Sequence, residues 1–211
     1  MRSIPKNKDD FIYMMSKIGF SFIRGCFVYL FLAKHSNVPF LGRGVKLISK
    51  KKLRVGKFVW IGHCCYFDLD SNQINIIGSG STIREFSVIQ CRSGLNLRGD
   101  KLVIGENVFI GPFSKIGVGG PVTISGGCQI GSHFSINAET HEERDGNFTS
   151  GHVSRKGVFI GENVWIGDKV TILDGVSIGN SCVIGAGAVV TKSFPAASKI
   201  VGVPARRVEK K

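Results

Sequence analysis

Isoleucine and valine return every six residues along most of this chain. The inward candidates are Val55, Ile61, Phe67, Ile77, Ile83, Ile89, Ile104, Ile110, Ile116, Ile124, Ile130, Ile136, Ile160, Ile166, Ile172, Ile178, Ile184 and Val190. A step of six is a multiple of the two-residue period of a strand and does not fit the 3.6-residue period of a helix. The pattern therefore predicts strands that all point one apolar side chain inward.

These eighteen positions group into six sets of three. So strict a repeat over more than 130 residues favours an all-β solenoid, a parallel β-helix with three short strands per coil. Glycine follows directly after Ile160, Ile166, Ile178 and Ile184, where it tolerates the backbone of a sharp corner. Stacked coils would form three parallel sheets around an aliphatic core. The periodicity alone does not determine the handedness.

The downstream hexads resemble a known family. The runs VFIGENVWIGDKVTILDGVSIGNSCVIGAGAVVTK and IVGVPARRV are similar to those of the hexapeptide-repeat acyltransferases, and the similarity extends over roughly residues 40–208. Within that superfamily the chain most resembles the O-acetyltransferases of capsule, lipopolysaccharide and other surface saccharides. It is more distantly similar to maltose and galactoside acetyltransferases. The resemblance implies a left-handed β-helix, acetyl-CoA as co-substrate, a saccharide acceptor and a homotrimer.

The pattern divides the chain into three parts. We expect a basic, apolar N-terminal helical segment at residues 1–50, a β-helix of about six coils at 51–194 and a tail at 195–211. The repeat pauses between Ile136 and Ile160, which are 24 residues apart, one coil plus one hexad. We therefore expect a loop at about 141–157, extruded after the fourth coil. Loops on rigid scaffolds commonly carry function.

Charge and hydropathy single out the N-terminal segment. Of the net charge of +13, +11 lies in residues 1–57, which favours an anionic surface such as a membrane, an acidic glycan or nucleic acid. Residues 11–33 are almost wholly apolar, with Lys17 and Arg24 on one helical face. Two interpretations stay open, a helix that caps the solenoid and a helix that lies on a membrane surface, aided by the lysines from 50 to 52.

Three other interpretations of that segment are less favoured. Arg24 would lie near the middle of a spanning helix, and Asp9 and Asp10 do not suit a signal peptide. No recognisable element for nucleic-acid recognition accompanies the basic residues, so we expect no nucleic-acid partner.

Six cysteines without zinc-type spacing indicate a reducing compartment. We therefore expect a cytoplasmic protein, either free or peripheral at the inner face of the membrane.

His141 is the candidate general base. It lies at the pause in the repeat, and histidine titrates close to neutral pH, where proton abstraction from a hydroxyl is required. The stretch INAETH resembles the family segment whose histidine is the base, and Trp165 in VWIG matches the family's position beside the acetyl donor. We expect Glu139 to orient the imidazole. His152 is the rival base but lacks the motif. His63 and His133 are expected to be structural or exposed, and His35 lies in the basic N-terminal region with no partner visible in the sequence.

The remaining candidates concern the two substrates. Asn137 is expected to contact the acceptor, and Arg155 the acceptor or CoA. In GAGAVVTK, Gly185, Ala186 and Gly187 would let a backbone approach the cofactor closely. Lys192 and Arg206, or Arg207 beside it, are candidates for the CoA phosphates.

Together these features predict an acetyl-CoA-dependent O-acetyltransferase that acts by direct transfer in a ternary complex, with no metal. An amino-sugar N-acetyltransferase on the same fold is the close alternative. A zinc-dependent hydratase would need three converging histidines, and no H-x4-H pair is present. A non-catalytic solenoid would have no reason to place histidine and tryptophan on the acyltransferase pattern.

Overall fold

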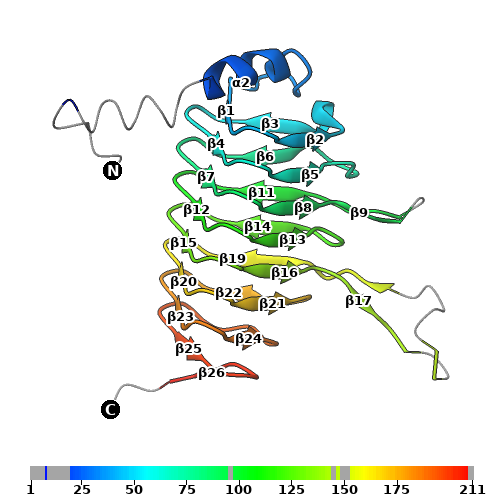
Figure 1. The fold of residues 1–211 in the computed structure, drawn as a ribbon. Coiled ribbons are helices and arrows are strands. Elements are labelled where there is room, and N and C mark those ends of the chain that lie inside the picture. The colour runs from blue at the N-terminus through cyan, green and yellow to red at the C-terminus, as the bar shows by residue number, and fades with distance from the viewer. Residues whose placement is uncertain (1–7, 9–19, 95–96, 144–145, 148–152, 209–211) are drawn as a thin grey trace.

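The protein folds as a left-handed parallel β-helix with three sheets, and helix α2 lies at its N-terminal end (Figure 1). The computed structural model describes residues 8, 20–94, 97–143, 146–147 and 153–208. Much of the apolar segment 11–33, including Lys17, and His152 of the loop lie outside these residues. The predicted fold class is confirmed.

Three parallel sheets form the sides of the prism. The first sheet contains β1 (Phe40–Leu41), β4 (Trp60–Ile61), β7 (Thr82–Ile83), β12 (Phe109–Ile110), β15 (Gln129–Ile130), β20 (Trp165–Ile166), β23 (Val183–Ile184) and β25 (Lys199–Val201), followed by the antiparallel β26 (Arg206–Arg207). The second contains β2 (Lys46–Ile48), β5 (Tyr66–Asp68), β8 (Val88–Gln90), β13 (Lys115–Gly117), β16 (Ser135–Asn137), β21 (Thr171–Leu173) and β24 (Val189–Val190). The third contains β3 (Leu53–Val55), β6 (Asn75–Ile77), β11 (Leu102–Ile104), β14 (Val122–Ile124), β19 (Val158–Ile160) and β22 (Ser177–Ile178).

The hexad residues stack in register along each sheet. Ile110 pairs with Ile83 on one side and Ile130 on the other, so equivalent inward side chains lie directly above one another. All eighteen predicted inward positions are at most 1% exposed. Parallel strands of two or three residues cannot be stable alone, and this continuous aliphatic column is what holds them together.

The β-helix begins and ends outside the range that the hexads suggested. β1 and β2 lie within residues 1–50 and add Leu41 and Leu47 to the core, and β25 adds Ile200 beyond residue 194. A short 3-10 helix, Lys50–Lys52, separates Leu47 from Val55 by eight residues instead of six, which hid the first coil from the periodicity. Six coils contribute a strand to every sheet.

The expected loop is a β-hairpin arm at the corner between the second and third sheets. β17 (Thr140–His141) pairs antiparallel with β18 (Val153–Ser154). After β16 in the second sheet, the next strand of the prism is β19 in the third sheet. All 24 residues from Ile136 to Ile160 therefore take the place of a single hexad step. The expectation of one coil plus one hexad was wrong for this reason. The arm follows the fifth strand of the second sheet, not the fourth, because the hexad pattern does not reveal the first coil.

A second hairpin leaves the same corner two coils earlier (Figure 1). It consists of β9 (Arg92–Gly94) and β10 (Leu97–Arg98), paired antiparallel. Its signal in the sequence is the step of fifteen residues between Ile89 and Ile104, which the grouping into triplets concealed. Both arms of the molecule therefore project from one edge of the prism.

Helix α2 (Ser21–Tyr29) lies at the N-terminal end of the prism (Figure 1). The Arg24 guanidinium donates a hydrogen bond from Nε to the carbonyl oxygen of Leu41 in the first coil, at 2.8 Å. This cation therefore faces the protein. None of the helices in the described part of the chain is long and apolar enough to cross a membrane.

Candidate active site

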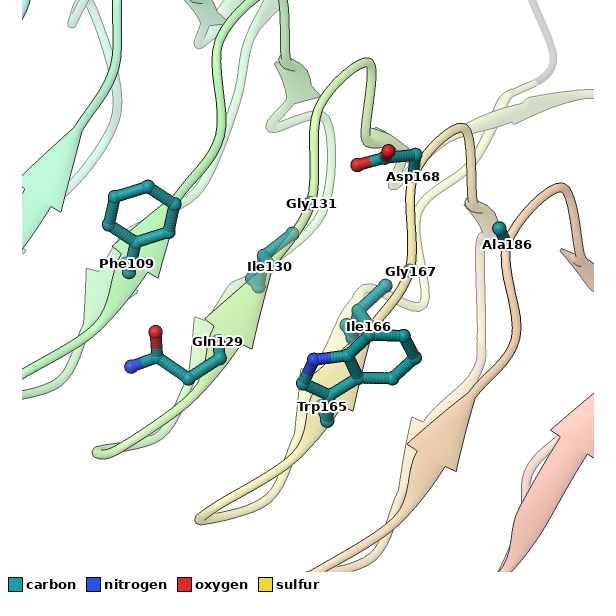
Figure 2. Close-up of a pocket in the computed structure, with 9 residues that line it drawn as sticks. All are labelled: Phe109, Gln129, Ile130, Gly131, Trp165, Ile166, Gly167, Asp168 and Ala186. Atoms are coloured by element: carbon teal, nitrogen blue, oxygen red, sulfur yellow. The ribbon is translucent and has the colours of Figure 1, made fainter.

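A cavity of about 310 Å³ lies on the outer face of the first sheet (Figure 2). Its lining consists of Phe109, Gln129, Ile130, Gly131, Trp165, Ile166, Gly167, Asp168 and Ala186. Phe109, Gln129 and Trp165 occupy the same register on β12, β15 and β20, so their side chains form one outward row. Half of the Trp165 surface is exposed, 50%, which leaves the indole free to contact a ligand.

Two glycines bring the backbone close to the floor of this cavity. A Cβ at Gly167 would lie 2.6 Å from the backbone nitrogen of Ala186, and one at Gly131 would collide with the Asp168 carboxylate. Only a hydrogen atom fits between these adjacent turns. The sequence signal for this floor is the glycine that directly follows Ile130 and Ile166.

Asp168 gives the rim of the cavity a fixed negative charge. Its Oδ1 accepts a hydrogen bond from the backbone nitrogen of Ser132 at 2.6 Å. This backbone hydrogen bond, helped by the Ser132 side chain, lowers the pKa of the Asp168 carboxyl below its usual 3.8. The carboxylate is therefore ionised at neutral pH. The sequence pattern does not mark this residue as functional.

The candidate CoA-binding residues are only partly gathered here. Ala186 lines the cavity, and Gly185 and Gly187 flank it in the same corner turn. Gly187 has a φ of +71°, a conformation that favours glycine. Lys192 and Arg206 are exposed and lie outside the lining, with Lys192 Nζ 5.8 Å from the centre of the Phe194 ring. These two cations lie further along the chain, toward the C-terminal end of the prism.

The arm holds the second group of candidates. His141 is exposed on β17 and faces Val153 across the hairpin. Asn137 ends β16 with its side chain exposed, close to the root of the arm. Glu139 connects these two strands, so the three residues share one short stretch of rigidly anchored chain.

Glu139 forms an ion pair with Arg155, with 3.3 Å between Glu139 Oε2 and Arg155 Nη2. Among the described residues no hydrogen bond joins Glu139 to His141, so the expected orienting contact is absent from the isolated chain. The ion pair also lacks hydrogen-bond geometry, and Glu139 Oε2 and Arg155 Nε are buried without hydrogen-bond partners. Arg155 donates further to Ser93 Oγ and to the Arg98 carbonyl, each at 3.1 Å. It thus joins the two hairpins.

Asp174 fixes the other side of the arm, and sequence reasoning missed it. Its carboxylate accepts hydrogen bonds from the backbone nitrogens of Gly157 at 2.7 Å and Lys156 at 3.1 Å, and from Ser154 Oγ at 3.3 Å. Gly120 completes the fit, because a Cβ there would lie 2.7 Å from the Arg155 carbonyl oxygen. Nothing in the sequence marks Asp174, since its partners are backbone groups of an inserted segment.

The two groups of candidates lie on different sides of the prism. Trp165 lies on the first sheet and Ala186 in the turn directly after its strand β23. His141 leaves the corner between the second and third sheets, opposite the first sheet. Figure 1 shows β17 and β20 on opposite sides of the molecule. One copy of the chain therefore does not bring the candidate base to the cavity.

The other histidines have local roles where they are described. His133 occupies a left-handed corner with a φ of 55°, and its ring stacks on Phe113 with 5.1 Å between centroids. His63 Nδ1 accepts a hydrogen bond from the Arg43 backbone nitrogen at 3.0 Å. His35 also has a positive φ, of 63°. Within the described residues, no three His, Cys, Asp or Glu side chains are placed to hold a metal ion together.

Comparison with known proteins agrees with this architecture. Residues 157–192 match the model of the bacterial transferase hexapeptide (six repeats). A galactoside acetyltransferase in complex with coenzyme A is similar at 23% identity, with 93% of this chain and 84% of that chain covered and a TM-score of 0.53. The polySia-specific acetyltransferase NeuO is 21% identical, with 82% and 86% covered and a TM-score of 0.51.

A third similar structure is that of an N-acyltransferase. It is a variant of AntD, an N-acyltransferase from Bacillus cereus in complex with dTDP and coenzyme A. The identity is 20%, with 80% of this chain and 82% of that chain covered and a TM-score of 0.55. At these identities the three structures establish a shared fold.

Proposed function

We propose that this chain, which carries the bacterial transferase hexapeptide on the fold of the hexapeptide-repeat acetyltransferases, moves an acetyl group from acetyl-CoA to a hydroxyl of a surface saccharide. The observation that carries the proposal is that the chain contains two features. One is the cavity beside Trp165, with its glycine floor. The other is His141 on an arm whose root is clamped by Asp174 and Arg155.

His141 acts as the general base in this proposal. Its imidazole takes the proton of the acceptor hydroxyl while the alcohol oxygen attacks the thioester carbonyl. The carbon–sulfur bond then breaks, the acetyl group stays on the saccharide oxygen, and the thiolate of CoA receives the proton. The reaction needs no covalent enzyme intermediate, because the base and the two substrates meet directly.

The donor lies along the first sheet. The pantetheine arm fits a narrow groove whose floor is glycine backbone and whose wall is the exposed Trp165 indole. Gly185, Ala186 and Gly187 extend this groove toward the C-terminal coils, where Lys192 and Arg206 are the cations for the phosphates. The negative charge of Asp168 at the rim would repel the phosphates of CoA next to Trp165. This favours a position of the phosphates further along the prism.

The acceptor lies beside the arm. Asn137, exposed next to the root, is our candidate for an acceptor contact. Glu139 and Arg155 are engaged with each other and with the second hairpin, so they shape the wall. The site is complete only when the arm of one copy meets the first sheet of another, and we propose the threefold homo-oligomer that the family resemblance implies.

We place the protein in the cytoplasm, where acetyl-CoA is available. All six cysteines are free, which suits a reducing compartment. N-acylation of an amino sugar is the second candidate, and the AntD structure favours it because that N-acyltransferase has the same fold. The two candidates differ only in the acceptor atom.

The test is release of CoA thiol from acetyl-CoA over a panel of surface glycans that includes amino sugars. The native protein should turn over with one hydroxyl acceptor, and His141→Ala should lower kcat by about 10²-fold or more. His63→Ala, at a histidine remote from the arm, is the matched control and should retain activity. Equal turnover by His141→Ala and the native protein would overturn the assignment of the base, and exclusive turnover of amines would establish the second candidate.

A further inference from the structure

Helix α2 presents most of its large apolar side chains to solvent, whereas Val28 packs against the core. Ser21 and Gly25 are buried against the first coil. Ile23, Phe27 and Leu30 point away from it, at 48%, 72% and 78% exposure. Their spacing of four and three residues puts them on one helical face. A surface helix of a globular protein normally has the opposite arrangement, with the apolar face on the core.

The contacts of α2 prevent it from turning this face inward. Gly25 lies so close to the chain that a Cβ would collide with the Pro39 carbonyl oxygen. Arg24 is bonded to the Leu41 carbonyl on the same side. The segment after the helix is tied down as well, by a hydrogen bond of 2.8 Å from the Ala33 backbone nitrogen to the Leu53 carbonyl. The apolar face is thus held outward by close packing behind it.

Helix α2 and the coils next to it are rich in basic residues. Residues 20–67 contain nine Lys or Arg and no Asp or Glu. The nine are Arg24, Lys34, Arg43, Lys46, Lys50, Lys51, Lys52, Arg54 and Lys57. Lys50 Nζ lies 5.4 Å from the centre of the exposed Phe31 ring, so the basic residues border the apolar face. Figure 1 shows that α2 and the first coil together form one end of the prism.

We infer that this end of the molecule docks on the surface of a bilayer that contains anionic lipids. The side chains of Ile23, Phe27 and Leu30 enter the boundary between headgroups and acyl chains, and the lysines from 50 to 52 contact the headgroups. A second copy would bring two strongly basic surfaces together, and a nucleic acid would leave the apolar face unused. The inference does not depend on the proposed function.

The experiment is co-sedimentation of the full chain with vesicles. One set consists of phosphatidylcholine alone and the other also contains phosphatidylglycerol. We expect binding to the anionic set that weakens as salt is added. The double variant Phe27→Ser, Leu30→Ser should bind about tenfold more weakly or worse, because it removes two inserted apolar side chains. Lys50→Gln, Lys51→Gln, Lys52→Gln should lose a similar factor on anionic vesicles.

Matched variants separate docking from general effects. One control is the double variant Phe159→Ser, Val203→Ser, which removes two exposed apolar residues far from α2. The other is the triple variant Lys101→Gln, Lys115→Gln, Lys199→Gln, which removes three charges outside the first coil. Both controls should bind vesicles as the native protein does. Exposed Cys26 on α2 gives a second readout, since vesicles should slow its alkylation. CoA release with a dissolved acceptor should be unchanged by Phe27→Ser, Leu30→Ser.

Two results would overturn the inference. One is equal vesicle binding by the native protein and Phe27→Ser, Leu30→Ser. The other is a change in molar mass by light scattering in that variant without a change in vesicle binding, which would assign the face to a second copy. Loss of CoA release in His141→Ala has no bearing on either, so failure of this inference and failure of the proposed function are distinguishable.

Discussion

At the scale of single residues, position within the hexad decides what a side chain does. Cys65 and Cys128 follow their inward isoleucines by four residues and are buried as part of the core. Burial raises the pKa of the Cys65 thiol to about 11 and that of Cys91 to about 12. A thiol that is both buried and protonated is a poor nucleophile.

Alkylation of the native protein at neutral pH should therefore label two cysteines per chain, Cys26 and Cys64, which are the exposed ones. After denaturation all six should react. Intact mass followed by peptide mapping gives both counts. Rapid labelling of Cys91 in the native state would mean that the third coil opens far more readily than its packing suggests.

At the scale of elements, the β-helix tolerates large insertions because each coil is held by its neighbours above and below. Both hairpins leave the corner between the second and third sheets, and each is bounded by strands that keep their register. What makes the larger arm rigid at its base is not its own two-residue strands. It is the set of contacts from Asp174 and Arg155.

Asp174→Ala should consequently lower kcat/KM by about tenfold to hundredfold, because small displacements of a base are costly in catalysis. The melting temperature should change by only a few degrees, since the core is untouched. Steady-state kinetics and thermal unfolding check the two parts. Asp174→Asn keeps one carbonyl acceptor and should lose less activity. A large fall in melting temperature with unchanged kcat/KM would instead make Asp174 a residue of fold stability alone.

At the scale of the whole molecule, one chain separates the candidate base from the candidate donor groove. The arm and the first sheet are on opposite sides of the prism (Figure 1), and in the proposed assembly a neighbouring copy closes that distance. A cyclic assembly in which every interface is identical would form one site per interface.

Two inactive variants should then rescue each other. His141→Ala and Trp165→Ala, unfolded together, refolded and mixed in equal amounts, should regain about a quarter of native activity, because about one interface in four combines an intact histidine with an intact tryptophan. His141→Ala mixed with the double variant His141→Ala, Trp165→Ala is the control and should regain none. Activity that stays at the level of the single variants would place both residues of each site in one chain.

The sequence by itself determined the fold and its core. Every predicted inward position is buried, because the hexad is a local rule that each coil obeys with little dependence on its neighbours. The same rule accounts for the burial of Cys65 and Cys128, four residues after their inward isoleucines, and its pause marks the arm. It failed at the first coil, where the 3-10 helix Lys50–Lys52 lengthens one step, and at the second hairpin.

Only the tertiary structure decided which side of the prism each candidate occupies. The ion pair of Glu139 with Arg155 and the hydrogen bonds of Asp174 to the arm join segments that are distant in the chain. The outward face of α2 is set by close packing behind the helix. Periodicity reports whether a side chain points inward. Periodicity carries no information about which residues contact an inserted segment, because those residues come from other coils of the solenoid.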